Sequence, residues 1–267
     1  MHPSVPAPGF WLPTLSLCWR ELVRFLRQRN RIIGALATPV VFWLLIGGGM
    51  GTSVRLGPGG HTFLHYFFPG TLIMILLFTA IFSTISIIED RREGFLQSVL
   101  VAPVSRASVV MGKVLGGTVL ATGQGLLFLA LAPWVGFEFT LGSALLTIAV
   151  MFVVSFALTS LGFCIAWRMT STQGFHAIMN LFLMPMWFLS GALFPVAGAV
   201  IGLKVLMLAN PLTYGLDAMR DAMNMGSRSV FPGPAFATSF GITVAFALAI
   251  YLLASWIAKR GSDADLG

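Results

Sequence analysis

Six long apolar runs, separated by shorter polar segments, dominate the pattern of hydrophobic and polar positions along the chain. Each run approaches the roughly 20 residues that a helix needs to cross the hydrocarbon core of a bilayer. The runs cover residues 32–50, 67–88, 107–134, 141–167, 174–195 and 237–258. We therefore predict an all-α polytopic membrane protein, with six spans in a single transmembrane domain over residues 1–267.

Composition supports this prediction and adds an orientation. Of the 267 residues, 57% are hydrophobic and only 9% are charged, whereas about a quarter of the residues in an ordinary soluble domain are charged. Twelve of the 16 Lys and Arg residues lie on one side of the predicted topology and four on the other. By the positive-inside bias we expect the basic side, and with it both termini, to be cytoplasmic. This indicates a multi-pass protein of a plasma membrane, or of a bacterial inner membrane.

An amphipathic segment precedes the first run. After a Pro-rich lead over residues 1–13, which we expect to be disordered, residues 14–31 predict an interfacial helix. Its expected apolar face carries Leu15, Cys18, Trp19, Leu22, Phe25 and Leu26. Its expected polar face carries Arg20, Arg24, Arg27, Gln28 and Arg31. Two interpretations stay open: a basic anchor that fixes orientation, or a docking element for a partner.

The loop between the second and third runs is dense in charge. It begins with Glu89, Asp90, Arg91, Arg92, Glu93 and Gly94. The next residues predict a short helix with one apolar face formed by Phe95, Leu96, Val99 and Leu100, ended by Pro103. Such a helix, held between two spans, is suited to act as a lever. The alternative is a hairpin that packs only against its own protein or the lipid surface.

The loop between the last two runs contains an apolar stretch over residues 196–208 that is too short to span. Such a stretch re-enters the membrane or lies along its surface. A turn and a helix follow from Asn210, and Asp217 and Arg220 are spaced to pair on the surface of that helix. In the third run, small residues at four-residue spacing predict close helix contacts; they are Gly112, Gly116, Gly117, Ala121 and Gly125.

Several kinds of chemistry lack their residues in this sequence. The apolar runs hold almost no ionisable groups near their centres, which disfavours a secondary carrier. The Gly112–Lys113 pair lacks the rest of a phosphate-binding loop, so we expect no ATPase site in this chain. His61 and His65 alone are too few ligands for a metal. We accordingly expect no catalytic residue, no metal and no cofactor here.

The order of these features resembles the membrane subunit of type-2 ABC exporters over nearly the whole chain. The resemblance is carried by Phe68-Pro69-Gly70, by the segment from Gly94 to Arg106, and by Asn210-Pro211-Leu212-Thr213-Tyr214. It implies a permease that forms a homodimer or pairs with a related permease. It also implies two copies of a cytoplasmic ABC ATPase that bind ATP and Mg²⁺, contact with membrane lipids, and no nucleic acid.

The resemblance further implies roles for particular residues. The segment from Glu93 to Ala102 resembles the coupling helix that docks on the ATPase, and the amphipathic segment resembles the connecting helix beside it. A substrate path near the second and fifth spans would involve Phe78, Phe82, Asn180, Met184, Trp187 and Phe188; lipid-facing or core packing is the alternative. Relatives often have a second acidic residue before Gly94 and Thr-Leu-Glu after it, so the identity of the ATPase stays open.

We therefore expect the permease subunit of an ATP-driven exporter, moving a lipophilic drug, a lipid or a lipid-linked glycan outward. A separate ATPase docked on the 89–106 loop would supply the energy. The alternatives are a membrane scaffold that binds an ATPase without transporting anything, and a secondary carrier.

Overall fold

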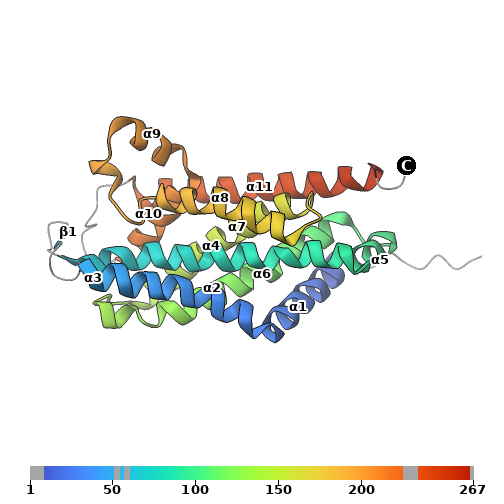
Figure 1. Cartoon of the computed structure of the whole chain (residues 1–267), viewed down its shortest axis with the longest axis horizontal. Coiled ribbons are helices and arrows are strands. Elements are labelled where there is room, and N and C mark those ends of the chain that lie inside the picture. The colour runs from blue at the N-terminus through green and yellow to red at the C-terminus, as the bar shows by residue number, and fades with distance from the viewer. Residues whose placement is uncertain (1–8, 51–54, 57–60, 225–233, 265–267) are drawn as a thin grey trace, which may run out of the picture.

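The computed structural model describes residues 9–50, 55–56, 61–224 and 234–264, which form an elongated helical bundle (Figure 1). The helices are α1 (Trp11–Arg27), α2 (Arg29–Phe42), α3 (Gly48–Met50), α4 (Phe63–Arg92), α5 (Phe95–Val101), α6 (Arg106–Leu129), α7 (Leu141–Ala166), α8 (Thr172–Phe188), α9 (Ile201–Ala209), α10 (Pro211–Met223) and α11 (Phe236–Ala264). A π-helical turn (Trp43–Gly47) joins α2 to α3, and 3-10 turns cover Ala132–Val135 and Val196–Gly198. Two short strands, β1 (Arg55–Leu56) and β2 (His61–Thr62), pair in antiparallel fashion. The all-α membrane fold predicted from the sequence is confirmed.

Local sequence explains where the main helices begin. Ser105 caps α6 by accepting a hydrogen bond from the Ser108 backbone N–H at 3.1 Å, and Thr140 forms a reciprocal capping box at the start of α7. The Asn210 side chain caps α10 by accepting a hydrogen bond from the Leu212 backbone N–H, with Pro211 at the first helical position, where no N–H is needed. These caps satisfy backbone donors that a helix start otherwise leaves unpaired.

Four helical segments among the described residues are long and apolar enough to cross a membrane: Ile32–Met50, Phe63–Arg92, Leu141–Ala166 and Phe236–Arg260. The third and fifth predicted spans are present as α6 and α8 but fall outside this group. α8 has 17 residues, about 25 Å of helix, which is less than the roughly 30 Å hydrocarbon core. The prediction of six spans therefore stays a prediction.

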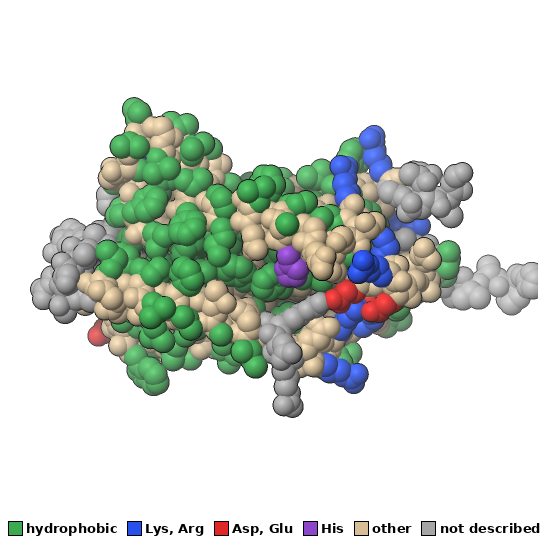
Figure 2. All heavy atoms as spheres, in the orientation of Figure 1, with side chains coloured by type: hydrophobic (Ala, Val, Ile, Leu, Met, Phe, Trp, Pro, Cys, Tyr) green, Lys and Arg blue, Asp and Glu red, His purple; other side chains and the backbone are tan. Residues whose placement is uncertain are grey.

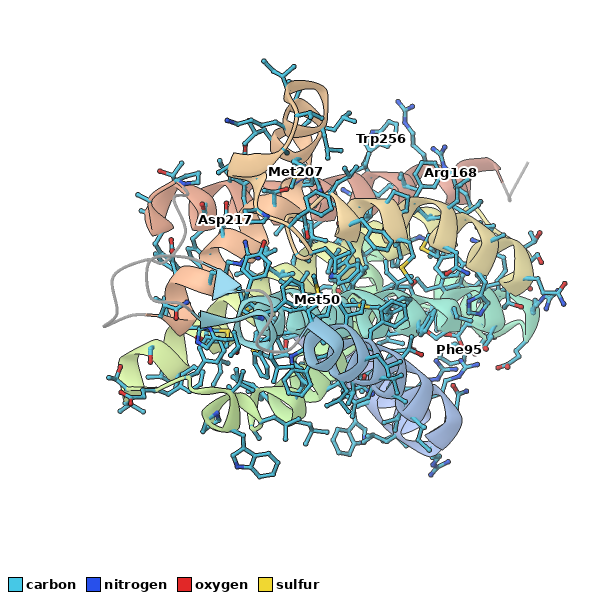
Figure 3. The ribbon with its side chains drawn as sticks, turned by 60° about the vertical axis from the view of Figure 1, so that its left-hand side comes forward. Met50, Phe95, Arg168, Met207, Asp217 and Trp256 are labelled. Carbon is cyan, nitrogen blue, oxygen red and sulfur yellow. The ribbon has the colours of Figure 1, made fainter. Side chains whose placement is uncertain are left out.

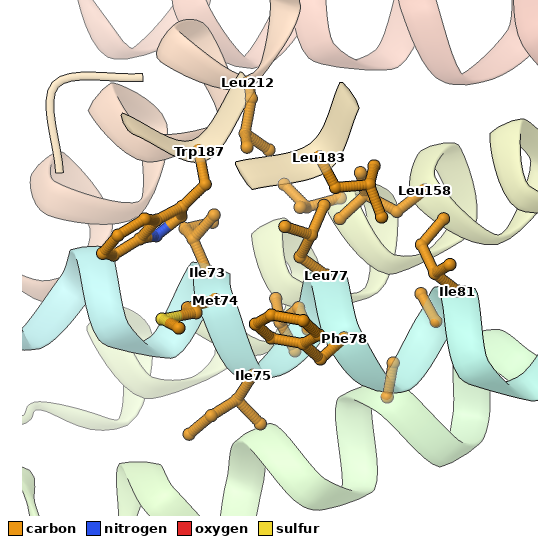
Figure 4. Packing of buried hydrophobic residues seen from close by; sticks show 14 of the residues in the cluster. Ile73, Met74, Ile75, Leu77, Phe78, Ile81, Leu158, Leu183, Trp187 and Leu212 are labelled. Atoms are coloured by element: carbon orange, nitrogen blue, oxygen red, sulfur yellow. The ribbon is translucent and has the colours of Figure 1, made fainter. Parts of the chain in front are cut away.

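α4 lies at the centre of the bundle and forms most of the core. In its most apolar stretch, 94% of the residues are buried, covered by α2, α6, α7 and α8. Figure 4 shows Leu77 and Ile81 of α4 packing beside Leu158 of α7 and Leu183 of α8. A helix that is apolar on all sides is suited to such a position.

The glycines of α6 allow close packing on two of its sides. A Cβ added at Gly117 would lie 2.3 Å from Ser83 Oγ on α4, and one at Gly125 would lie 2.5 Å from Met151 on α7. On another side, a Cβ at Gly112 would lie 2.8 Å from Leu17 on α1. The predicted close helix contacts are confirmed, and they include a contact with α1.

Candidate functional site

Charged side chains gather at one end of the bundle, beside α5 and the C-terminal end of α11 (Figures 1 and 2). We call this the α5 end, and the opposite end, which carries α9 and α10, the α9 end. The face shown in Figure 2 is otherwise largely hydrophobic between the two ends. This distribution suits a bundle whose middle is surrounded by lipid.

The predicted short helix is present as α5. Gly94, immediately before it, has a φ of +75°, a left-handed conformation that favours glycine. Leu96 is buried with 3% of its surface exposed, whereas Val101 is 82% exposed. Val99 is half-buried and Pro103 is exposed. The predicted apolar face is therefore only partly available to a partner; the side chain of Leu100 lies outside the described part of the structure.

A network of ion pairs joins α1, α4 and α6 at this end; we call Arg20, Glu21, Arg24, Asp90 and Lys113 the ionic cluster. Asp90, at the end of α4, is fully buried. Its carboxylate accepts hydrogen bonds from the Arg20 guanidinium at 2.7 and 3.0 Å, and from Arg24 and Lys113. Lys113 also bonds to Glu21 at 2.5 Å. Three cations thus face two buried carboxylates that come from different helices.

The cluster extends towards the surface, and only its edge is exposed. Arg24 also bonds to Glu89 at 2.9 Å and to Glu93 at 3.3 Å. Burial lowers the pKa of Arg20, but its hydrogen bond to Asp90 and the nearby carboxylates outweigh burial and raise it overall. These partners therefore stabilise the charged form of the Arg20 guanidinium.

The structure divides the charged residues of the 89–106 loop into two groups. Asp90 is enclosed within the chain, so it does not belong to the outer surface as the docking prediction had it. Arg91 donates to the carbonyls of Trp167 and Met169, the latter at 3.1 Å. Arg92 and Glu93 are exposed, and these two present their charge outward.

α1 also differs from its prediction. It begins at Trp11, inside the segment expected to be disordered, and ends at Arg27; residues 29–31 belong to α2, and residues 1–8 lie outside the described part of the chain. The predicted apolar face is divided. Phe25 is buried, whereas Leu15, Trp19 and Leu26 are exposed.

The cause is that α1 packs on α6 through a mixed face. Thr14, Leu17, Glu21 and Phe25 lie at four- and three-residue spacing and are all buried. Because Glu21 meets Lys113 there, the inward face includes a charge that an apolar pattern does not reveal. The outward apolar residues are then placed to meet lipid. Of the arginines predicted to be on the polar face, Arg27 is exposed and Arg20 and Arg24 are half-buried, while the side chain of Arg31 lies outside the described part of the structure.

The predicted substrate-path residues do not form one surface in a single chain. Trp187 is fully buried, and its indole N–H donates to the Gly70 carbonyl at 2.8 Å; its position is that of core packing. Phe78 is buried and packs on Phe82, with ring centroids 5.6 Å apart. On α8, Asn180 and Phe188 are exposed and Met184 is half-buried. An outward face of α8 thus exists.

The α9 end contains a second polar centre. Arg220 of α10 and the Tyr66 hydroxyl of α4 both donate to the Gly191 carbonyl at 2.8 Å. The Arg220 guanidinium also lies 4.5 Å from the centre of the Tyr66 ring. Asp217 lies 3.9 Å from Arg220, but Arg220 is buried, so the predicted surface pair is in fact an interior one. Burial raises the pKa of Asp217 to about 6.

Sequence reasoning missed Glu21 and gave Lys113 no role beyond topology. The sequence contained part of the information needed to find these two residues. Glu21 is the acidic residue within an otherwise basic segment, and Lys113 falls between two glycines of the third run. Only the packing of α1 on α6, through Gly112 and Gly116, brings their side chains together.

The helical bundle and its lipid-compatible middle define an integral membrane protein with a charged centre at one end. The model of the ABC-2 type transporter family matches residues 14–224, and the chain belongs to this family. It is therefore an ABC transporter permease.

Relatives of nearly equal length support this assignment. A protein of Cyanophora paradoxa that is named as a transport permease, ycf38, is 24% identical and covers 96% of this chain and 92% of its own. Nodulation protein J of Rhizobium leguminosarum bv. viciae is 26% identical over 82% of this chain and 85% of its own. The inner membrane transport permease YadH of Escherichia coli K12 is 23% identical over 94% and 96%.

Proposed function

We propose that the chain is the membrane subunit of an ATP-driven exporter, powered by a separate ABC ATPase that docks on the α5 end. Two copies of the ATPase, each binding ATP and Mg²⁺, would serve a dimer of permeases. The α5 end would face the cytoplasm, and the substrate would move towards the α9 end. The family supports the class of protein; the ATPase, the dimer and the direction are the proposal.

The observation that carries the proposal is the structure of α5. It is a seven-residue helix between α4 and α6, with Leu96 anchored in the core and Val101 exposed. A partner that moves Val101 therefore also moves the ends of two long helices. This is the arrangement expected of a lever that converts closure of an ATPase pair into helix movement.

We propose that the substrate is lipophilic: a drug, a lipid or a lipid-linked glycan. α8 carries Asn180, an exposed amide, together with exposed apolar side chains; they are Leu181, Phe182 and Phe188. α4 is almost wholly covered by its own chain, so the outward face of α8 is the better candidate for a path between two permeases. Such a face combines apolar area with a few polar groups, as binding sites for lipophilic molecules do.

The test is co-purification of an ATPase from the source membrane with the tagged permease, comparing wild type with Val101→Asp. We choose Val101 because Leu96 is buried, so Leu96→Asp would damage the fold itself. Val200→Asp is the matched control, since Val200 is 75% exposed at the α9 end. We expect Val101→Asp to lose at least 10-fold of the bound ATPase and Val200→Asp to keep it.

Two further results would decide the rest of the proposal. Absence of any ATPase from the wild-type sample would contradict it. ATP hydrolysis that no lipophilic compound stimulates, in a complex that moves none of them in vesicles, would favour a scaffold over an exporter.

A further inference from the structure

We propose that α1 is a driven part of the lever at the α5 end, held to α4 and α6 as one rigid unit by Lys113 and Glu21, and is more than a passive anchor. This inference rests on the proposed function for its consequence in transport. The rigid unit itself is a property of the chain alone. Lys113 and Glu21 are thus proposed as positioning residues.

The first observation is the position of Lys113. Its side chain is 3% exposed and lies between Glu21 of α1 and Asp90 of α4, whose side chains are 5% and 0% exposed. A buried cation facing carboxylates on two other helices is stable only while both remain in place, because separating them leaves unpaired charge away from water. The contact therefore resists sliding of α1 relative to α4 and α6.

The second observation is the closeness of α1 and α6. A Cβ at Gly112 would lie 2.8 Å from Leu17 Cβ, and one at Gly116 would lie 2.7 Å from Glu21 Cβ. The Thr14 hydroxyl, which donates to the Phe10 carbonyl at 2.8 Å, also lies 3.3 Å from the Ser108 carbonyl of α6. A helix that binds only to the membrane surface would not need to pack so closely on another helix. These contacts extend over about two turns of α1, so they fix its direction as well as its position.

The third observation links α1 directly to α5. The Arg20 guanidinium lies 3.6 Å from the centre of the Phe95 ring, at the start of α5, while the same group bonds to Asp90. Arg20 therefore touches both the short helix and the buried carboxylate. A displacement of α5 reaches α1 through Arg20 and reaches α6 through Asp90 and Lys113.

The test measures the distance between nitroxide labels at Ser16 on α1 and Gln97 on α5, both exposed. Cys18 and Cys164 are first replaced by Ser, and labelled chains are diluted with unlabelled ones. In wild type we expect a narrow distance distribution that ATP does not change in the ATPase complex. The distance from Gln97 to a label at Val200 should change with ATP.

Two variants loosen the unit in different ways: Glu21→Gln with Lys113→Gln, and Gly116→Val. Both should at least double the width of the Ser16–Gln97 distribution in the permease alone, while the ATPase still binds. In the complex we expect the substrate moved per ATP hydrolysed to fall several-fold. The control pair, Glu138→Gln with Lys204→Gln, removes the same charges from exposed α9-end positions and should change nothing.

Equal widths in wild type and both variants, measured on the permease alone, would overturn the inference. So would a Ser16–Gln97 distance that shifts with ATP as much as the Gln97–Val200 distance. Failure of the ATPase to bind wild type would contradict the proposed function instead, and the measurement on the permease alone would still decide whether α1 is held rigidly.

Discussion

The two ends of the bundle are held together by different chemistry. At the α5 end, the ionic cluster joins three helices through five charged side chains. At the α9 end, Arg220 bonds to the Gly191 carbonyl and lies over the Tyr66 ring, with Asp217 at 3.9 Å. Figure 3 labels Phe95 and Asp217, which mark these two ends.

The difference has a physical consequence. Ion pairs among several buried charges depend on every member, because the loss of one leaves others uncompensated. A guanidinium that bonds to a carbonyl and lies over an aromatic ring depends less strictly on these partners, since both of them are neutral and the carboxylate of Asp217 is 3.9 Å away. The α5 end should therefore be the more sensitive of the two to single substitutions.

The largest loss of folding stability is expected for Asp90→Asn. The substitution leaves Lys113, Arg20 and Arg24 with one negative charge fewer in a buried place, at a cost of about 3–5 kcal/mol in the free energy of unfolding. Thermal unfolding of the detergent-solubilised protein measures it. Glu93→Gln is the matched control, because the Glu93 side chain is 60% exposed, and it should stay within about 0.5 kcal/mol of wild type. Similar losses from the two variants would refute the importance of burial.

A smaller effect is expected for Arg220→Met. It removes the bond to the Gly191 carbonyl and the contact with the Tyr66 ring, together about 2–3 kcal/mol. The same unfolding assay applies, with Lys204→Met as the control, since Lys204 is exposed. If Arg220→Met cost more than Asp90→Asn, the contrast between the two ends would be wrong.

Acid should stabilise the α9 end through Asp217, whose pKa of about 6 lies above its ordinary value of 3.8. The folded state then binds the proton more tightly than the unfolded state, so this stability is complete below pH 3.8 and is lost as pH rises through 6. Its nearest charged neighbours are Arg220 and Asp221. Between pH 7.5 and pH 5 we expect a gain on the order of 1 kcal/mol.

The difference in unfolding temperature between wild type and Asp217→Asn, followed over this pH range, isolates the contribution of this carboxyl. The two proteins should converge as pH falls if the wild-type carboxyl becomes neutral. A constant difference would show that Asp217 does not titrate there.

The smallest effect is expected for Gly94→Ala, which forces an alanine into a left-handed conformation at the start of α5. The cost is about 1 kcal/mol. Gly123→Ala is the opposite control, because Gly123 lies within α6 with no atom near its would-be Cβ, and alanine there should stabilise the helix by up to about 1 kcal/mol. Equal and opposite shifts in the unfolding temperature would confirm that backbone conformation is the cause.

Much of the fold could be predicted because the bilayer demands long apolar helices. The helical class, the short helix after Gly94, the turn at Asn210 and the close contacts of α6 all follow from local patterns. The ends of α1 could not be predicted, because its Pro-rich beginning suggested disorder while its packing on α6 supports a helix from Trp11.

The two charged centres were harder to predict from the sequence, for a different reason. A sequence pattern shows which residues share a face of one helix but not what that face meets. Arg20 and Arg24 looked solvent-facing until the end of α4 placed Asp90 beside them. The sequence predicted an exposed Arg220, but in the structure the turn at Gly191 covers this side chain. In both places a long-range contact decides burial.

The burial of α4 has a consequence for how the protein is made. α4 is synthesised before α6, α7 and α8, which later cover it, so it must first reside among acyl chains and then exchange them for neighbouring helices. Its apolar surface on every side suits both surroundings, since lipid tails and leucine side chains are alike as solvents. During biogenesis this helix must therefore be stable in contact with lipid before it is buried in the interior of the folded protein.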